Sequence, residues 1–509
     1  MYRIFILIFL LYFKSFTQNV KIVDENNTPI SGVLLYSTPK FYVSSDIDGM
    51  ASLDMFSKSD SLTIQQYGFV KEKIIKSSID NVIVLKDNNE ILNEVVLSAS
   101  KFSQRSREIP KKINQISQAT IEFTNPMTSA DLLERSGNIY IQKSQLGGGS
   151  PMIRGLSTNR LVLSVDGVRL NNAIYRGGNM HNIISVSPMN IENTEIIMGS
   201  ASVLYGSDAI GGVMNFYTKK PTLSETELPK IKINVNSRYS TAATEKMNHF
   251  DINYGKKKIA FLSSISYSSY GDLKMGSNGF SDYLRPNYVS QNSQGEDVII
   301  ENPNPKVQRN TGYNQLNLLQ KILYTPNKYI QFDLGFHFSK TSDIPRYDRL
   351  IRDDGQGGLF YGNWFYGPQE WMLINNQITL NPKSTSIFDK LKLTTALQRF
   401  SESRNSRKLY EFNLNTRDEK LNILSLNLDL IKKINQSSDL TYGLEFIDNK
   451  VNSFGTSTDI NDFTTTEIAS RYPNNSSLKS FGGYFNYKNK IIDDIFFQSG
   501  VRYSFTKLQ

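Results

Sequence analysis

The sequence predicts a mainly β protein built from a small β-sandwich, a mixed α+β region and an antiparallel transmembrane β-barrel. Short strand-like segments separated by turn residues fill the N-terminal part. A glycine-rich middle part holds one helix candidate, and the long C-terminal part alternates apolar with polar residues. With 509 residues, the chain is long enough for several domains.

The composition excludes several functions before any motif is considered. The sequence has no run of about 20 apolar residues, so a bundle of membrane helices is excluded. It has 0 Cys and 3 His, which excludes disulfides, thiolate metal sites and short-spaced zinc motifs. The net charge is +9, but Lys and Arg are scattered, so we expect no nucleic-acid partner. We also expect no bound metal and no cofactor.

Residues 1–17 are predicted to be a signal peptide. Arg3 gives a minimal positive start, and Ile4–Phe13 is an apolar run too short to span a membrane as a helix. We expect cleavage between Thr17 and Gln18. A buried strand or core helix is the alternative, but a run this apolar that begins at position 4 is rarely either of them. The protein is therefore expected to leave the cytoplasm.

Residues 18–88 are predicted to form the β-sandwich. Turn signals such as Asp46–Gly49 separate its short strand-like segments, which lie near residues 20–23, 33–36, 61–64 and 81–85.

The linker, residues 89–108, contains one short β-prone run in a polar and basic setting. Such a run can add as an extra strand to the exposed sheet edge of another protein, where main-chain hydrogen bonds supply the affinity. An ordinary strand of the neighbouring domain is the alternative. The run consists of Glu94, Val95, Val96, Leu97, Ser98 and Ala99.

Residues 109–220 carry an ordered series of glycine-containing motifs. The segment Thr128–Arg135 is the helix candidate, and Gly137 ends it. Each motif alone is only a turn signal, but their order along the whole region is much more specific. The residues that define the motifs are Arg154, Gly155, Asp166, Gly167, Arg169, Glu195, Gly206, Gly211 and Gly212.

Residues 221–509 alternate apolar and polar residues in strands of about ten residues, as a transmembrane barrel requires. The segment Leu424–Leu430 has Leu at every even position and polar residues at every odd position. In Ile330–Phe338 the even positions are apolar, which turns His337 toward the lumen by parity. Since lipid cannot satisfy a free strand edge, the sheet is expected to close on itself. A large soluble β-sandwich, which also alternates, is the alternative.

The motif series closely resembles the plug domain of TonB-dependent outer-membrane receptors. Arg154–Leu156, Val165–Arg169 and Leu204–Val213 carry the resemblance. One departure is Met198–Ser200, where the family usually has Arg-Gly-Pro. Residues 94–99 then resemble a TonB box, which the family places just before the plug. Residues 18–88 resemble the carboxypeptidase-regulatory-like domain found in receptors of the Bacteroidetes type.

The resemblance implies a location and partners. The plug, residues 109–220, would lie inside a barrel of which residues 221–509 supply the N-terminal part, roughly 12 of 22 strands. The barrel would cross the outer membrane many times as a monomer, with the N-terminal domain in the periplasm. TonB and its inner-membrane energising complex would pull on the TonB box to import a scarce ligand. No bond in the ligand would break, so the chain is expected not to be an enzyme.

The expected ligand is an iron carrier, with haem slightly ahead of siderophores. His181, together with Tyr175 and Arg176, lies in a plug stretch expected to face outward, and His and Tyr are ligands of haem iron. An ordinary polar loop residue is the alternative for His181. Aromatic and Arg anchors in a long barrel loop are further ligand-side candidates, with a girdle or loop-packing role as their alternative: Arg346, Tyr347, Arg349, Trp364 and Tyr366.

Charged plug residues are expected to meet charged barrel residues. The candidates are Arg154, Arg169 and Glu195, and a solvated surface charge is the alternative for each.

Two other functions stay open. A passive porin or adhesin would use the same barrel, although it has no reason to carry a plug or a TonB box. The second alternative function is import of cobalamin or another non-iron nutrient.

Overall fold

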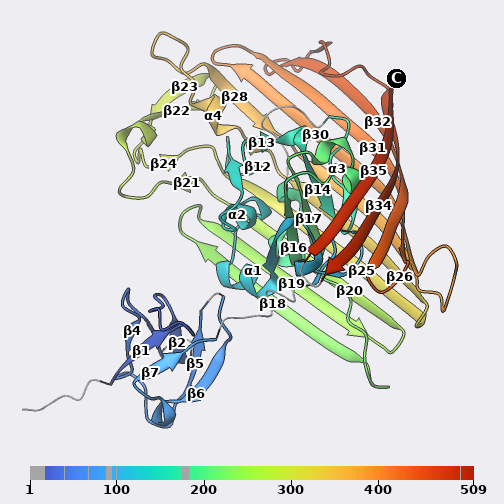
Figure 1. The fold of residues 1–509 in the computed structure, drawn as a ribbon. Coiled ribbons are helices and arrows are strands. Elements are labelled where there is room, and N and C mark those ends of the chain that lie inside the picture. The colour runs from blue at the N-terminus through green and yellow to red at the C-terminus, as the bar shows by residue number, and fades with distance from the viewer. Residues whose placement is uncertain are drawn as a thin grey trace, which may run out of the picture. The chain divides into compact units, whose positions relative to one another are not determined.

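The computed structural model describes residues 18–38, 41–66, 68–86, 95–98, 100–174, 183–492 and 495–509. The chain divides into two compact units, whose elements are labelled in Figure 1. The first comprises Met1–Val95 with Arg105–Arg107, and the second comprises Val96–Gln104 with Glu108–Gln509. The expected signal peptide, residues 1–17, lies outside the described residues.

The first unit consists of two small sheets around one apolar core. One sheet has the order β4-β1-β7 and the other the order β3-β2-β5-β6. Val20 and Ile22 of β1 both enter the core, since alternate residues of a strand face the same side. The carboxypeptidase-regulatory-like assignment of this unit stays a prediction. The strands are β1 (Asn19–Val23), β2 (Leu34–Thr38), β3 (Phe41–Ser44), β4 (Met50–Ser52), β5 (Ser61–Gln65), β6 (Glu72–Ile75) and β7 (Val82–Val84).

The plug region is built on a five-stranded sheet with the order β10-β16-β17-β14-β15. β14 and β17 run parallel, and the other neighbours are antiparallel. β14 is buried along its whole length, which suits its mostly apolar sequence. The strands are β10 (Lys112–Ser117), β14 (Leu161–Val165), β15 (Val168–Arg169), β16 (Ile191–Met198) and β17 (Gly212–Thr218).

Short helices and a three-stranded sheet complete the plug. The predicted helix forms as α2 (Ser129–Glu134), because Thr128 and Asp131 cap it reciprocally: each side chain accepts a hydrogen bond from the other's backbone N–H. The remaining elements are β8 (Val95–Val96) paired with β9 (Gln104–Arg105), α1 (Gln118–Thr124), β11 (Tyr140–Gln142), β12 (Ser150–Ile153), β13 (Leu156–Ser157) and α3 (Ser202–Tyr205).

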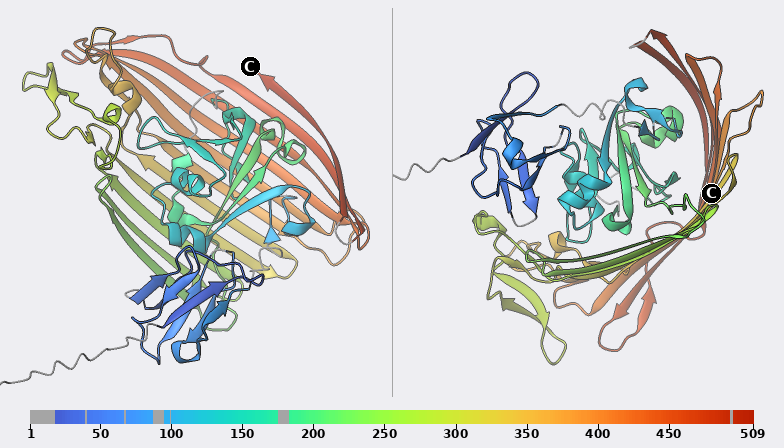
Figure 2. Two further views of the ribbon diagram at one scale, coloured as in Figure 1. Left: turned by 60° about the vertical axis from the view of Figure 1, so that its left-hand side comes forward. Right: turned by 90° about the horizontal axis from the view of Figure 1, so that it is seen from below.

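A 14-stranded sheet within the described residues follows the plug, and its long strands pair antiparallel in sequence order. Figure 2 shows this sheet curving around the plug. It has more strands than expected because three short ones form in the connecting loops: β27 (Ile344–Pro345), β28 (Tyr361–Tyr366) and β33 (Thr465–Glu467). The long strands are β18 (Lys230–Ser240), β19 (Glu245–Gly255), β20 (Ile259–Tyr270), β25 (Tyr313–Asn327), β26 (Ile330–Thr341), β29 (Glu370–Leu380), β30 (Lys390–Lys408), β31 (Asn413–Lys433), β32 (Ser438–Asp459), β34 (Ser476–Ile492) and β35 (Ile495–Leu508).

The predicted alternation is confirmed along these strands. In β31, Leu424 and Leu426 are exposed on the outer face of the sheet, while Ser425 and Asn427 are buried on the inner face. The mainly β fold class is therefore confirmed, including the antiparallel barrel-type sheet. Among the described residues, no helix is long and apolar enough to cross a membrane.

The two ends of the sheet differ in the length of their connections. Residues 271–312 and 342–369 form long loops at the end where β25 begins, whereas residues 256–258 and 328–329 are short turns at the other end. Barrels of outer membranes have long extracellular loops and short periplasmic turns, so the long-loop end is taken as extracellular. These loops hold β21 (Leu273–Lys274) paired with β24 (Val307–Gln308), β22 (Asn287–Gln291) paired with β23 (Asp297–Glu301), and α4 (Tyr347–Leu350).

The plug packs on the inner wall of the sheet through several apolar clusters, one of which lies at β29 and β30. Met214 and Phe216 of β17 share a buried cluster with Trp371 and Leu373 of β29 and with Ala396 of β30. Other clusters join Ile184 to the long-loop end of the sheet and Ile174 to β31 and β32, and polar contacts add to them.

Candidate functional site

The predicted TonB box is docked on the plug where the structure describes it. The Val96 side chain is 1% exposed, and the backbone N–H groups of Leu97 and Ser98 both donate to the Glu195 carboxylate, with shortest distances of 2.9 and 2.7 Å. The Tyr205 hydroxyl donates to the Ser98 carbonyl at 2.9 Å. Burial raises the pKa of Tyr205, so the phenol stays a donor.

Two plug side chains thus hold three main-chain groups of the predicted TonB box. Glu94 and Ala99, the two ends of the box, lie outside the described residues. The contacts of Glu195 also differ from the expectation that this residue pairs with a charged residue of the barrel. Its fully buried carboxylate instead accepts hydrogen bonds from the docked segment.

An ion pair anchors the chain just after the docked segment. Lys101 Nζ lies 2.9 Å from Asp429 Oδ1 of β31, and both side chains are largely buried. The Tyr484 hydroxyl donates to the same carboxylate oxygen at 2.7 Å. Lys392 of β30 donates to the Lys101 carbonyl at 2.8 Å. The barrel therefore takes part in holding the docked segment.

Arg169 joins plug and barrel as the sequence suggested. Its guanidinium contacts Asp208 of the plug at 3.1 Å and Glu445 of β32 at 3.4 Å. Arg502 of β35 contacts the same Glu445 oxygen at 3.0 Å. Gly206 lies directly against the Arg169 and Arg502 guanidinium groups. Arg154, the other predicted charge partner, is exposed in a plug turn.

Asp166 forms a second link between plug and barrel. One of its carboxylate oxygens accepts from the Thr218 N–H at 2.9 Å, and the other lies 2.9 Å from Lys321 Nζ of β25 and 3.3 Å from His337 Nε2 of β26. Burial alone would raise the pKa of Asp166, but Lys321 and His337 hold that pKa well below its ordinary value. The carboxylate is therefore a fixed negative charge at the plug–barrel contact.

The glycine motifs have conformational reasons within the plug. Arg154–Gly155 and Asp166–Gly167 are the central residues of the β12–β13 and β14–β15 hairpins, and all four residues have positive φ. That pattern is the type I′ turn, which favours Gly at its second position. Gly211 and Gly212 are packed too closely for a larger residue, since a Cβ on Gly212 would lie 2.5 Å from the Ile197 carbonyl.

A small polar hollow lies between the plug and strands β31 and β32. Lys101, Arg169 and Tyr205 line it from the plug side. On the barrel side, Ser425 Oγ and Asn427 Oδ1 are buried there without a hydrogen-bond partner. Ile174 of the plug also packs against Ile423 and Ile447 of these strands, so this seam combines apolar and ionic contacts.

Three of the predicted ligand-side residues form a packed cluster in the extracellular loops. The Arg346 guanidinium lies 4.9 Å from the Trp364 ring centre and donates to the Tyr366 hydroxyl at 2.8 Å. Tyr366 is fully buried in an apolar cluster that includes the plug residue Ile184. These contacts favour the loop-packing alternative for Trp364 and Tyr366. Arg349 is partly exposed beside Asp348.

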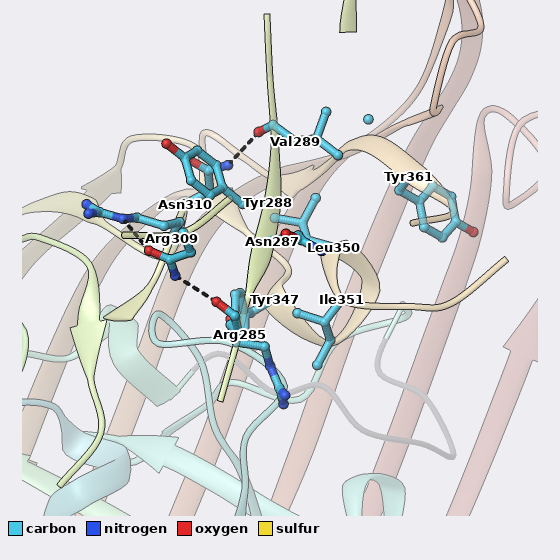
Figure 3. Close-up of a pocket in the computed structure, with 12 residues that line it drawn as sticks. Arg285, Asn287, Tyr288, Val289, Arg309, Asn310, Tyr347, Leu350, Ile351 and Tyr361 are labelled. Atoms are coloured by element: carbon cyan, nitrogen blue, oxygen red, sulfur yellow. Dashed lines mark hydrogen bonds between the residues drawn. The ribbon is translucent and has the colours of Figure 1, made fainter. Parts of the chain in front are cut away.

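Tyr347 instead lines a pocket in the same loops, shown in Figure 3. The pocket is walled by the 271–312 loop on one side and by α4 and β28 on the other. Arg285 and Arg309 contribute cations to it, and Tyr288 and Tyr361 contribute further phenol rings. It brings together residues that are more than 70 positions apart in the sequence.

Several predicted residues are not placed, and several important ones were not predicted. Tyr175, Arg176 and His181 lie outside the described residues, so their role at haem stays a prediction. In the described part of the chain, no group of three or more His, Asp or Glu is positioned to hold a metal ion. The sequence analysis missed Lys321, Arg285 and Arg309. A charged residue at a lumen-facing position would have indicated Lys321, whereas two Arg in a polar loop carry little signal.

The comparisons with known proteins agree with this geometry. Residues 105–213 match the family model described as the TonB-dependent receptor plug domain. The vitamin B12 transporter BtuB of Vibrio vulnificus strain CMCP6 is 29% identical over 272 residues, which are 53% of this chain and 37% of that relative. The chain thus spans well under two thirds of the length of this curated relative.

Two solved structures share the fold at low sequence identity. The ferripyoverdine receptor of the outer membrane of Pseudomonas aeruginosa has a TM-score of 0.57 and 10% identity, covering 96% of this chain and 62% of that chain. The copper transporter OprC has a TM-score of 0.57 and 13% identity, and the match covers 81% of this chain and 55% of that chain. The prediction that the chain is not an enzyme agrees with the transport proteins and receptors that it matches. Residues 105–213 therefore match a TonB-dependent receptor plug domain, and the 14-stranded sheet shares its fold with the barrel wall of a solved outer-membrane receptor.

Proposed function

We propose that the protein imports a scarce ligand actively through the outer membrane, energised by TonB, and acts as a monomer. The observation that carries this proposal is the docked segment 96–98, held on the plug by Glu195 and Tyr205. A passive porin has no use for a plug with a docked strand-like segment.

Docking and TonB binding compete for the same main-chain groups. An added strand needs free N–H groups along one edge, and successive N–H groups of a strand point to opposite edges. Glu195 occupies the N–H groups of both Leu97 and Ser98, so a strand partner on either edge requires release of at least one of them. Ligand binding outside would loosen the plug, free this segment and let TonB pull it.

The test uses a Pro at Val96 and a proton ionophore. Pro removes a ladder N–H and restricts φ, so Val96→Pro should stop uptake while surface binding of the ligand persists. The ionophore should stop uptake in wild-type cells, because energy comes from the inner membrane. Uptake that survives both treatments would support a passive channel and contradict the proposal.

We infer that the cargo is an iron chelate. The cationic pocket in the outer loops supports this inference, and so does the fold shared with a ferripyoverdine receptor. Cobalamin is the second candidate, because the curated relative is named a vitamin B12 transporter. Growth of a gene-deletion strain on single iron or vitamin B12 sources separates the two, since only the true cargo should require the gene.

Haem is tested separately through His181. Ferric haem held by an imidazole gives a characteristic Soret spectrum. His181→Ala should shift that spectrum and weaken hemin binding at least tenfold, about 1.4 kcal/mol. A wild-type protein that gives no hemin spectrum would remove haem from the candidates and leave siderophore-type chelates.

A further inference from the structure

A group of cations lies on the outer face of the sheet, toward the long-loop end. Alternate residues of a strand face the same side, so the exposed Leu424 and Leu426 of β31 define the outer face for the residues in register with them. On this face β30, β31, β32, β34 and β35, which follow one another in the sheet of Figure 1, each carry one Lys or Arg. These residues form the cationic patch: Arg399, Lys420, Lys450, Lys479 and Lys507.

The strand register brings the first three cations of the patch together. Asn422 of β31 lies opposite Arg399 on one side and Lys450 on the other. Lys420 is two residues from Asn422 and therefore faces the same side. It is a diagonal neighbour of both Arg399 and Lys450, a position about 7–8 Å away in a sheet. The three cations thus form a triangle across neighbouring strands.

The other two cations continue the patch onto β34 and β35. Lys450 lies opposite Ser477, so Lys479, two residues further along, is again a diagonal neighbour. Lys479 lies directly opposite Lys507, where Cβ atoms are about 4.5–5.5 Å apart. Like charges in directly opposed positions destabilise a sheet. An anion bound between these two ammonium groups removes that repulsion.

The charge of the patch is not neutralised within the protein. On neighbouring strands of the same sheet, Lys340 of β26 pairs with Glu370 of β29 at 3.3 Å. None of the five patch cations has such a carboxylate partner among the described residues. Two carboxylates, Asp418 and Asp448, share the outer face of β31 and β32, so the cations still outnumber them.

The patch lies where lipid headgroups meet the protein. On its periplasmic side the same face is apolar, since Leu426 lies opposite Phe446, which in turn lies opposite Phe481. The patch lies between this apolar band and the extracellular end, at which β31 begins and β32 ends. Lys and Arg at the edge of an apolar band lay their aliphatic stems along the lipid chains and place their charges among the headgroups.

We propose that the cationic patch binds a lipid of the outer leaflet that carries more than one phosphate. Lys and Arg form charge-assisted hydrogen bonds with phosphate oxygens, and a headgroup with several phosphates reaches several of these cations at once. The acyl chains of the same lipid lie on the apolar band beside the patch. One bound lipid therefore ties five neighbouring strands together and offsets the repulsion between Lys479 and Lys507. The inference concerns the lipid around the protein and holds for any cargo.

The test measures binding of diphosphoryl lipid A to the purified protein in a non-ionic detergent by native mass spectrometry. Lys450→Gln combined with Lys479→Gln removes two neighbouring cations and should weaken this binding at least tenfold, about 1.4 kcal/mol. Lys450→Arg combined with Lys479→Arg keeps both charges and should bind the lipid as the wild type does. Monophosphoryl lipid A, with one phosphate fewer, should bind the wild type more weakly.

The matched control is Lys246→Gln. Lys246 is an exposed cation on the outer face of β19 at the same end of the sheet, and uncharged residues, Tyr239 and Ser269, lie opposite it. Because Lys246 lies outside the patch, its replacement should leave the binding of diphosphoryl lipid A unchanged.

Four outcomes would overturn the lipid site. They are a wild-type protein that binds no diphosphoryl lipid A, an affinity unchanged in the double Gln variant, and an affinity lost in the double Arg variant, which keeps the charges. The fourth is an equal loss in Lys246→Gln, because the effect would then be one of general surface charge. Inorganic pyrophosphate separates a lipid from a free anion: if it competes with lipid A at similar concentration, the patch is a site for soluble anions and the proposal is wrong.

Discussion

At the scale of single residues, Glu195 is the group on which release of the predicted TonB box depends. A hydrogen bond to a charged acceptor contributes roughly 1.5–3 kcal/mol, and Glu195 accepts such bonds from two backbone N–H groups. Glu195→Gln removes the charge and should raise the population of the released segment at least tenfold. A Cys in place of Ser98 measures the released population by thiol labelling. Ser98 is fully buried in the docked segment and its hydroxyl has no hydrogen-bond partner, so the thiol becomes accessible only on release. Thiol labelling should accelerate with Glu195→Gln but not with Glu192→Gln, on the same strand; equal rates would contradict the role of Glu195.

Asp166 gives a second residue-scale prediction, for the pH dependence of stability. Its pKa in the folded protein lies below the unfolded value of about 3.9, so its contribution is complete above that pH and is lost as the pH falls further. Asp166→Asn leaves Lys321 buried without its counter-charge and should cost about 3–5 kcal/mol near neutral pH. Thermal unfolding of the wild-type protein and of Asp166→Asn between pH 7 and pH 3 measures the difference in their stability. The difference should shrink below about pH 3.9; a constant difference would mean that the carboxylate charge is not involved.

At the scale of elements, β31 marks an edge of the apolar band on the outer face of the sheet. Asn422 pairs with Arg399 and Lys450 in register, whereas Leu426 pairs with Thr395 and Phe446. Leu426→Arg should therefore destabilise the protein by about 2–4 kcal/mol, and Asn422→Arg on the same face by only about 0–1 kcal/mol. Urea unfolding from phospholipid vesicles measures both. An equal loss of stability in the two variants would mean that the edge of the apolar band does not lie between Asn422 and Leu426.

The sequence predicted these strands well because a period of two is a local property. Leu424–Leu430 shows it without reference to any neighbour, and the hairpin at Asp166–Gly167 is equally local. The docking of Leu97 and Ser98 was not predictable, since it uses backbone groups and a Glu about 100 positions away. The same holds for the loop pocket, where Arg285 and Tyr347 meet only after two loops fold together.

At the scale of the whole molecule, the plug is attached to the barrel wall by unlike contacts. The side at β29 is an apolar core, whereas the side at β31 and β32 combines ion pairs around a polar hollow with a smaller apolar cluster at Ile174. The extracellular loops touch the plug through Ser144, and the docked segment lies at the short-turn end. If the protein imports its ligand as proposed, the plug has to shift relative to the wall while the barrel stays intact.

A disulfide between plug and barrel tests that requirement. Val203 of α3 packs on Gly500 of β35, with a Cβ on Gly500 only 2.8 Å from the Val203 side chain. The chain has 0 Cys, so Val203→Cys with Gly500→Cys creates one defined pair. Oxidised receptor should bind ligand at the surface with wild-type affinity but import none, and reduction should restore import, since only the covalent tie has changed. The two single-Cys variants control for the substitutions themselves. Normal import by the fully oxidised protein would show that this part of the plug stays in place while the ligand passes, and would confine the moving part to the seam at β31 and β32.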